Sequence, residues 1–338
     1  MGAAIVHASA VSPRQNRSVD GEISLGTWPR TQLQWSGNCA TAALVRYLHA
    51  HGEIVQSSQL DAQGYPLAPP LHSGVNATLS ELGLTTLQMN RTIARSGRWG
   101  NPSDNYDGRT ASVANNHMTS WDVARLLWLF DDLPPAAQPR WEVAPGRPVD
   151  QGFISAPRKA LLRAILADAY SGSGLVSNRT CVTARAPVAV GPPPAPGILA
   201  RLADKWLDGG RLRTPFADYP YPGVVDDLGP DSVGAYSMDL SPCQRAAEVV
   251  YLNKAGLTNA AASSVGIVRG LPGPGRHFQR HYIVSFFSSL GSRFADEAAM
   301  KAVGLGRDAH RVTHLGTTQA IPTLGANLDA WLALWLED

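Results

Sequence analysis

The spacing of apolar residues predicts five helices, each bounded by residues that start or stop a helix. They cover 39–52, 75–84, 156–170 and 324–336, together with a helix that starts at 118–120 and ends at Pro134-Pro135. Thr119 or Ser120 is the N-cap of that helix, and its predicted buried stripe is Val123, Leu126, Leu127 and Phe130. The last helix carries a stripe expected in the core, formed by Leu328, Trp331, Leu332 and Trp335.

Strands are predicted only near the end of the chain. The stretches 246–252, 263–269 and 280–288 are rich in β-branched and aromatic residues, with Gly, Pro and Asn turns between them. This pattern is typical of an antiparallel meander. Residues 1–30 are expected to be irregular after a short apolar start. Helices first, then strands and a closing helix, predict an α/β or α+β architecture.

Composition places the chain among globular proteins with a sizeable core. Of the 338 residues, 44% are hydrophobic and 17% are charged, and 29 basic against 27 acidic residues give a net charge of +2. This balance implies no nucleic-acid partner, and no apolar run is long enough for a transmembrane segment. We expect one domain over 1–338, with the proline-rich stretch 171–240 as an irregular insertion.

The sequence offers few signs of a cofactor or a metal. It contains no dinucleotide fingerprint and no glycine-rich phosphate loop, so no cofactor is predicted. Four-residue spacings of histidine occur at 277/281 and 310/314, but neither pair has an intervening Glu, and no metal is predicted. Of the three cysteines, Cys39 is expected to be a small buried residue. Cys181 and Cys243 could pair in an exported protein.

A Ser-x-Asn triplet, Ser36-Gly37-Asn38, opens the first predicted helix. Ser and Asn are favoured N-cap residues, so this triplet could simply accept hydrogen bonds from the first turn. Alternatively, Ser36 relays a proton in an active site and Asn38 binds a substrate carbonyl.

A second motif, Lys254-Ala255-Gly256, lies between the first two predicted strands. Only four lysines occur in the chain, at 159, 205, 254 and 301. Lys254 could be an exposed lysine in a turn, because lysine is mostly found at the surface. In the other interpretation its ammonium group points into a cleft, and Gly256 lets the strand edge approach a ligand closely.

Taken in order, these motifs resemble the serine β-lactamase and penicillin-binding protein superfamily, and in particular class A β-lactamases. That family carries Ser-x-x-Lys, Ser-Asp-Asn and Lys-Thr-Gly motifs. Ser36 and Asn38 match the second motif, and Lys254 and Gly256 match the third. The resemblance covers about residues 30–170 and 245–338. It implies an antiparallel sheet with flanking helices and a helical subdomain, and acyl-enzyme hydrolysis of an amide or ester in a β-lactam or peptidoglycan-type substrate.

The resemblance also assigns roles to the matched residues. Ser36 and Lys254 are expected to be catalytic, with Ser36 passing a proton to the leaving nitrogen and Lys254 tuning Ser36. Asn38, Ala255 and Gly256 are expected to bind a small-molecule or peptide-like substrate, and no oligomeric state is implied. A protein of this family would be periplasmic or secreted.

Two features depart from the family pattern. No Ser-x-x-Lys occurs, since Ala156, Leu202, Tyr251 and Ala298 stand three places before the four lysines. The long polar loop at 90–117 holds only Asp104 and Asp107 where class A enzymes use a Glu to activate water. We therefore expect either an N-terminally incomplete hydrolase with little turnover or a non-catalytic binding or scaffold protein that keeps the fold.

Overall fold

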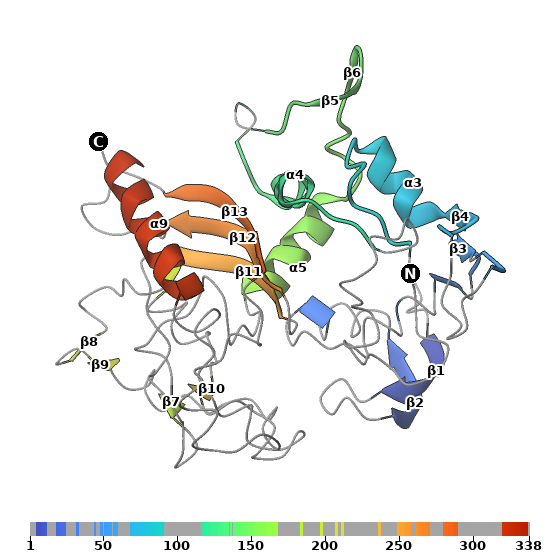
Figure 1. The fold of residues 1–338 in the computed structure, drawn as a ribbon, viewed down its shortest axis with the longest axis horizontal. Coiled ribbons are helices and arrows are strands. Elements are labelled where there is room, and N and C mark those ends of the chain that lie inside the picture. Colours follow the sequence, from blue (N-terminus) through green and yellow to red (C-terminus); the bar gives the residue numbers. More distant parts are fainter. Residues whose placement is uncertain are drawn as a thin grey trace. The chain divides into compact units, whose positions relative to one another are not determined.

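The computed structural model describes residues 5–11, 18–24, 32–33, 44, 48–49, 51–55, 57–59, 68–90, 116–134, 136, 138–167, 183–184, 197–198, 207–208, 211–212, 236–237, 249–257, 261–270, 280–289 and 320–336. Two compact units divide the chain. The first comprises Met1–Leu33 and Gly37–Arg163, and the second comprises Gln34–Ser36 and Ala164–Asp338. Helices and antiparallel strands both occur, which confirms a mixed α+β class (Figure 1).

Short antiparallel hairpins recur in the first unit. β1 (Ile5–Val11) pairs with β2 (Ser18–Ser24), and β3 (Ile54–Val55) pairs with β4 (His72–Ser73). Later, β5 (Glu142–Ala144) pairs with β6 (Arg147–Pro148). The expectation of irregular structure throughout residues 1–30 is therefore wrong for β1 and β2. Ladder hydrogen bonds come from the backbone, so a hairpin can form without a strong apolar alternation.

Three predicted helix ends of the first unit are set by local capping. Gly52 has φ 74°, its N–H donates to the His49 carbonyl, and the next N–H donates to Leu48. α3 (Gly74–Glu81) starts at the Ser73 cap and ends in the same way at Gly83, with φ 72°. α4 (Ser120–Phe130) starts at Thr119, whose side chain accepts from the Asp122 N–H. Thr119, Gly52 and Gly83 confirm the predicted start and stop signals, and the Ser73 cap was not predicted.

α4 ends earlier than the prolines predicted. Asp131 already has an extended backbone, with φ −71° and ψ 159°. Its carboxylate accepts the N–H of Asp132 at 2.8 Å, a local bond that competes with continuing the helix. The helix therefore stops at Phe130, before Pro134 is reached.

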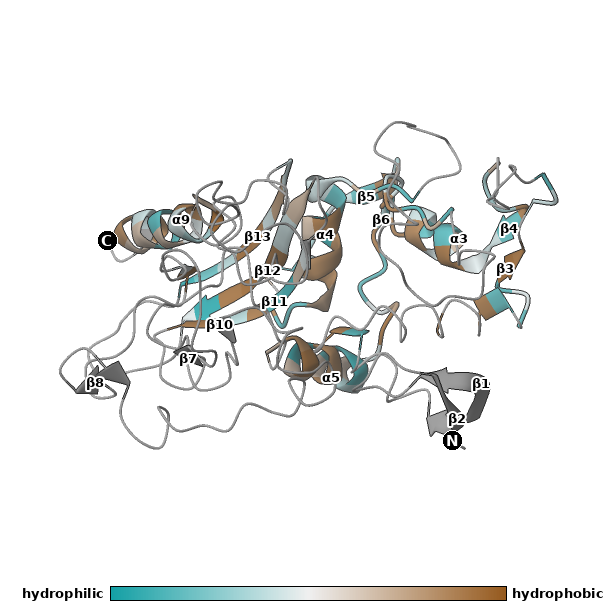
Figure 2. Cartoon of the chain, turned by 60° about the horizontal axis from the view of Figure 1, so that its bottom comes forward, coloured by the Kyte–Doolittle hydropathy of each residue, from teal (hydrophilic) through white to brown (hydrophobic). Residues whose placement is uncertain are grey.

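The core of the first unit forms where α3, α4 and the β5–β6 hairpin meet. α4 is mostly apolar along its length (Figure 2). Its Leu129 is only 1% exposed, although the predicted stripe did not include it. Leu129 packs in a buried cluster with Leu82, Leu84, Leu87 and Val149. The stripe residues Val123 and Leu126 lie at the border of this cluster and are only partly buried.

A buried carboxylate ties the segment after α3 to the start of α4. Asp122 accepts from the Thr86 N–H at 2.9 Å, from the Thr86 hydroxyl at 2.6 Å and from Arg125 at 2.9 Å. Burial alone would raise the pKa of Asp122, but the bonds from Thr86 and Arg125 outweigh burial and lower it. Asp122 therefore does more than complement the helix N-terminus.

α5 (Ala156–Ala167) runs from the first unit into the second, and Ile165 and Leu166 are its buried residues. Leu161 of the same helix is 52% exposed. Within 171–240 the described elements are two short antiparallel pairs. They are β7 (Thr183–Ala184) with β10 (Tyr236–Ser237), and β8 (Leu207–Asp208) with β9 (Arg211–Leu212). One domain with an irregular insertion here stays a prediction.

The predicted meander is the central sheet of the second unit. β11 (Val249–Leu257), β12 (Ala262–Gly270) and β13 (His281–Ser288) are antiparallel and lie in that order. β11 runs five residues beyond its predicted end at Leu252. Lys254–Gly256 therefore lies within β11 and not between two strands, and the alternative of an exposed lysine in a turn is wrong, because Lys254 pairs with Val265 and Gly256 pairs with Ser263.

α9 (Ile321–Leu336) lies against this sheet (Figure 1). Its buried residues are Pro322 and a set at four-residue spacing, Ile321, Gly325, Asp329 and Ala333. The predicted aromatic core stripe is wrong, because Trp331 is 54% and Trp335 is 69% exposed. Arg280, just before β13, and Tyr282 on β13 hold Asp329 on the buried face, and the indole rings of Trp331 and Trp335 stay exposed.

Candidate active site

Three of the five predicted site residues lie in the part of the chain that the structure describes. Lys254, Ala255 and Gly256 are consecutive residues of β11. Ser36 and Asn38 lie outside the described residues. Their proximity to Lys254 therefore stays a prediction, and the site below is built from the second unit alone.

The strand register places Lys254 on the sheet face opposite to α9. Tyr282 on β13 contacts α9, and the cross-strand pairs Tyr282–Val268 and Val268–Tyr251 put Tyr251 on the same face. Successive side chains of a strand point to opposite faces. Lys254, three positions after Tyr251, therefore projects from the other face, at the edge of the three strands.

The environment of Lys254 makes its amine less basic. Burial lowers the pKa of Lys254 from 10.5 to about 8. The ammonium group donates to the carbonyl of its neighbour Ala255. An amine with a pKa near 8 exchanges protons readily near neutral pH, and while protonated it attracts a carboxylate. Such a lysine is suited to proton relay and to holding an anionic substrate.

Hydroxyl groups lie on the same face as Lys254, and sequence reasoning missed them. A methyl group added at Gly256 would lie 2.8 Å from Ser263 Oγ, so the Ser263 hydroxyl occupies the space beside the glycine. Ser285 lies beyond Val265 on this face, and its Oγ is buried without a hydrogen-bond partner among the described residues. Ser263 and Val265 are two residues apart in β12, so they share a sheet face. Once the register was known to pair Val265 with Lys254, this spacing would have placed the Ser263 hydroxyl on the face of Lys254.

The opposite face carries a polar layer beneath α9. Asp329 on α9 is 2% exposed and accepts from Arg280 at 2.8 Å and from the Tyr282 hydroxyl at 2.8 Å. Burial, followed by the nearby charge of Asp329, raises the pKa of Tyr282. A lone acid in an otherwise uncharged 16-residue helix was the sequence signal for this contact.

Two more residues complete this layer. The Tyr251 hydroxyl lies 3.2 Å from Ser264 Oγ, and burial raises the pKa of Tyr251. Asn253 donates to the Tyr251 carbonyl, while its Oδ1 has no hydrogen-bond partner among the described residues. Asp329 fixes α9 on this face of the sheet, and the Tyr251–Ser264 contact joins β11 to β12 on the same face. The face opposite to Lys254 is therefore packed.

Other candidate residues fall mostly outside the described stretches. Asp104, Asp107 and the cysteines Cys39, Cys181 and Cys243 all do so. Their roles, including a Cys181–Cys243 disulfide, stay predictions. Within the described stretches, His, Cys, Asp and Glu residues form no group of three that could hold a metal ion. No helix among the described residues is long and apolar enough to span a membrane.

Comparisons with known proteins add no relative. The sequence matches no protein-family model, and neither a similar curated protein nor a similar solved structure was found. The geometry of Lys254 and its neighbours is therefore the basis for assigning a function.

Proposed function

We propose that the chain is a β-lactamase-like serine hydrolase of the class A or penicillin-binding-protein type. In this proposal Lys254-Ala255-Gly256 borders the substrate cleft, and Ser36 and Asn38 face it. The substrate is a strained amide or ester that carries a carboxylate, such as a β-lactam or a peptidoglycan-type peptide.

The observation that carries the proposal is the placement of Lys254. A structural lysine would keep its ammonium group in water, because burying a charge is costly. Lys254 instead lies at a sheet edge with a pKa of about 8. Perturbed lysines of this kind are concentrated at functional sites. The meander that follows Lys254 and the closing helix against it are also what the resemblance implies.

Each neighbouring group receives a role in the proposal. Gly256 keeps the strand edge clear for the substrate backbone, and the Ser263 hydroxyl supplies a donor for the substrate carboxylate. This hydroxyl offsets the one that is lost because Ala255 replaces the family's Thr. Ser36 passes a proton to the leaving nitrogen, and Asn38 binds the substrate amide.

The chemistry is acyl transfer. The attacking serine oxygen bonds to the substrate carbonyl carbon, and the carbon–nitrogen bond of an amide or the carbon–oxygen bond of an ester breaks. The leaving nitrogen or oxygen takes the hydroxyl proton of the attacking serine through Ser36. Water then cleaves the acyl ester. Because the sequence holds no Ser-x-x-Lys, we expect little or no turnover from this chain. The same absence favours the second candidate, a binding protein that keeps the fold.

Lysine NMR tests the proposed cleft, since only four lysines need to be assigned. With ¹³C at the ε carbons, the Lys254 signal should titrate near pH 8 and move when a chromogenic cephalosporin is added. Ser36→Ala should lower the pKa of Lys254 further by roughly 0.5–1, because a hydrogen bond to a charged group contributes about 1 kcal/mol or more. Ser80→Ala, on the exposed side of α3, is the matched control and should change nothing.

The outcomes separate the alternatives. If the cephalosporin does not bind and Ser36→Ala leaves Lys254 unchanged, the proposed cleft does not exist. Binding without turnover supports a cleft in a chain that lacks the nucleophile. Turnover that Ser36→Ala abolishes would keep the class of enzyme but would contradict the expected loss of the nucleophile.

A further inference from the structure

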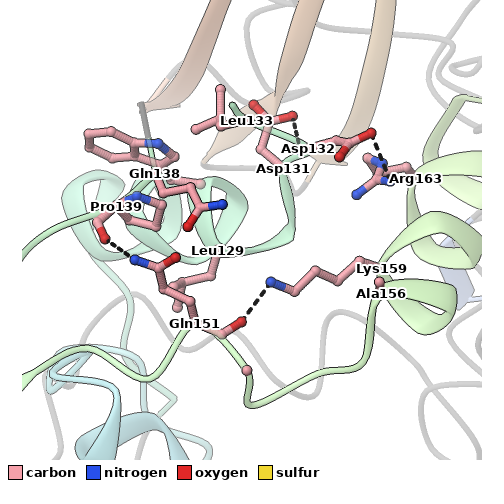
Figure 3. Close-up of a pocket in the computed structure, with 12 residues that line it drawn as sticks. Leu129, Asp131, Asp132, Leu133, Gln138, Pro139, Gln151, Ala156, Lys159 and Arg163 are labelled. Carbon is pink, nitrogen blue, oxygen red and sulfur yellow. Dashed lines mark hydrogen bonds and ion pairs between the residues drawn. The ribbon is translucent and has the colours of Figure 1, made fainter. Parts of the chain in front are cut away.

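A second site lies in the first unit, between the end of α4 and the start of α5. A cavity of about 350 Å³ opens there, lined also by residues 131–133, 138–139 and 151–152 (Figure 3). This volume falls within the roughly 300–1,000 Å³ of small-molecule pockets. All the lining residues are described, and none is a residue of the proposed acyl-transfer site.

Two cations of α5 line the cavity. Lys159 and Arg163 are four residues apart, so they project from the same side of the helix. The ammonium group of Lys159 reaches across to the Gln151 carbonyl at 2.8 Å (Figure 3). An ammonium group has three N–H donors, and among the described residues one donor of Lys159 has a partner, the Gln151 carbonyl. The other two remain available to a ligand.

The cavity wall is electrostatically suited to an anion. Lys159 lies in the first turn of α5, at the positive end of the helix dipole, and this turn contains no acid. Burial and then repulsion from Arg163 lower the pKa of Lys159, and the attraction of Asp150 does not reverse this. An anion bound beside Lys159 would relieve both effects.

The acids of the lining limit the charge that the ligand can carry. Asp132 lies 3.5 Å from Arg163, but its side chain is 69% exposed and so neutralises Arg163 only weakly. Asp131 is buried, and its carboxylate accepts the Asp132 N–H. The carboxylate of Asp132 beside Arg163, with that of Asp131 also in the lining, disfavours a doubly charged phosphate and favours a single negative charge.

The rest of the lining sets the body of the ligand. Leu129, Leu133 and Trp128 supply apolar surface from α4 and the segment after it. In Figure 3, Leu129 and Leu133 lie on the α4 side of the cavity, away from the α5 backbone. The pocket thus has a cationic wall on α5 and an apolar wall on α4.

We propose that this cavity binds a small monocarboxylic acid with an aromatic or branched aliphatic body. The carboxylate takes the two available N–H donors of Lys159 and a guanidinium N–H of Arg163. The apolar body rests on Trp128, Leu129 and Leu133.

The experiment uses phenylacetate as the probe and ¹³C-labelled lysine in the whole chain. Phenylacetate should move the Lys159 signal, raise the pKa of Lys159 and bind with a Kd of about 1 mM or tighter. Lys159→Gln should weaken binding at least about tenfold, and Lys159→Arg should keep it within a few fold because the charge remains. Lys254→Met should leave phenylacetate binding unchanged.

Three results would overturn the proposal. One is an unmoved Lys159 signal at saturating phenylacetate. Another is equal binding by wild type and Lys159→Gln in a folded protein, as judged by circular dichroism. The third is inorganic phosphate binding as tightly as phenylacetate. Because Lys254 is the control here, failure of this site and failure of the acyl-transfer site are distinguishable.

Discussion

Replacing Asp329 by Ala tests how the polar layer holds α9 on the sheet. Asp329 is 2% exposed and is the partner of both the Arg280 guanidinium and the Tyr282 hydroxyl. The Arg280 side chain is only 5% exposed. Asp329→Ala therefore leaves a buried cation without its carboxylate and a half-buried phenol without its acceptor.

The expected cost is large compared with the stability of a domain. Removing one partner of a buried ion pair typically costs about 3–5 kcal/mol, mainly because the remaining charge cannot be solvated. Typical domains are stable by only about 5–15 kcal/mol. Asp329→Ala should therefore remove a large share of the stability of the second unit.

Urea denaturation followed by far-ultraviolet circular dichroism measures this loss. Asn327→Ala, two residues away on the exposed side of α9, is the matched control and should change the free energy of unfolding by no more than about 0.5 kcal/mol. The double variant Arg280→Met/Asp329→Leu should recover most of the stability, because apolar residues can replace a buried ion pair. An Asp329→Ala cost within about 1 kcal/mol of the control would refute the buried-charge reasoning.

Two further predictions concern β11 and its neighbour. Lowering the pKa of Lys254 from 10.5 to about 8 costs about 3 kcal/mol below pH 8, and this cost disappears as the pH rises towards 10.5. Lys254→Met should therefore stabilise the protein at pH 7 by up to that amount but not at pH 10.5, and a pH-independent effect in urea denaturation would contradict the lowered pKa. Gly266→Ala should cost about 1–3 kcal/mol, because the new methyl group would meet the Leu252 carbonyl and, at 2.6 Å, Tyr251 Cε2. Gly256→Ala would meet only the Ser263 hydroxyl, which can rotate away, so equal losses of melting temperature in the two variants would count against this packing.

Signals that act over a few residues allowed the helices and strands to be predicted. Thr119 is a helix cap, as its side chain and position indicated, and Gly52 and Gly83 adopt the left-handed backbone that ends a helix. The β-branched runs near the end of the chain do form an antiparallel meander. Capping and alternation depend on the chain itself, so they can be read without knowing what packs against it.

Contacts between distant segments decided the buried face of α9 and the length of β11, which the pattern of apolar residues did not predict. Asp329 outcompetes two tryptophans for the buried face of α9, because Arg280 and Tyr282 lie opposite it, some 49 and 47 residues earlier. β11 continues through Lys254 because β12 supplies its ladder partners. The strand position of Lys254 decides on which sheet face its side chain lies, and the burial of that side chain lowers its pKa.

The sequence by itself determined the order of the main helices and of the closing meander, and it singled out Lys254 as a candidate. Only the tertiary structure revealed the Ser263 hydroxyl beside Gly256 and the cavity lined by Lys159 and Arg163. Side-chain periodicity tells which residues share a face, but the neighbours of that face come from other parts of the chain. Burial and charge at a site depend on those neighbours.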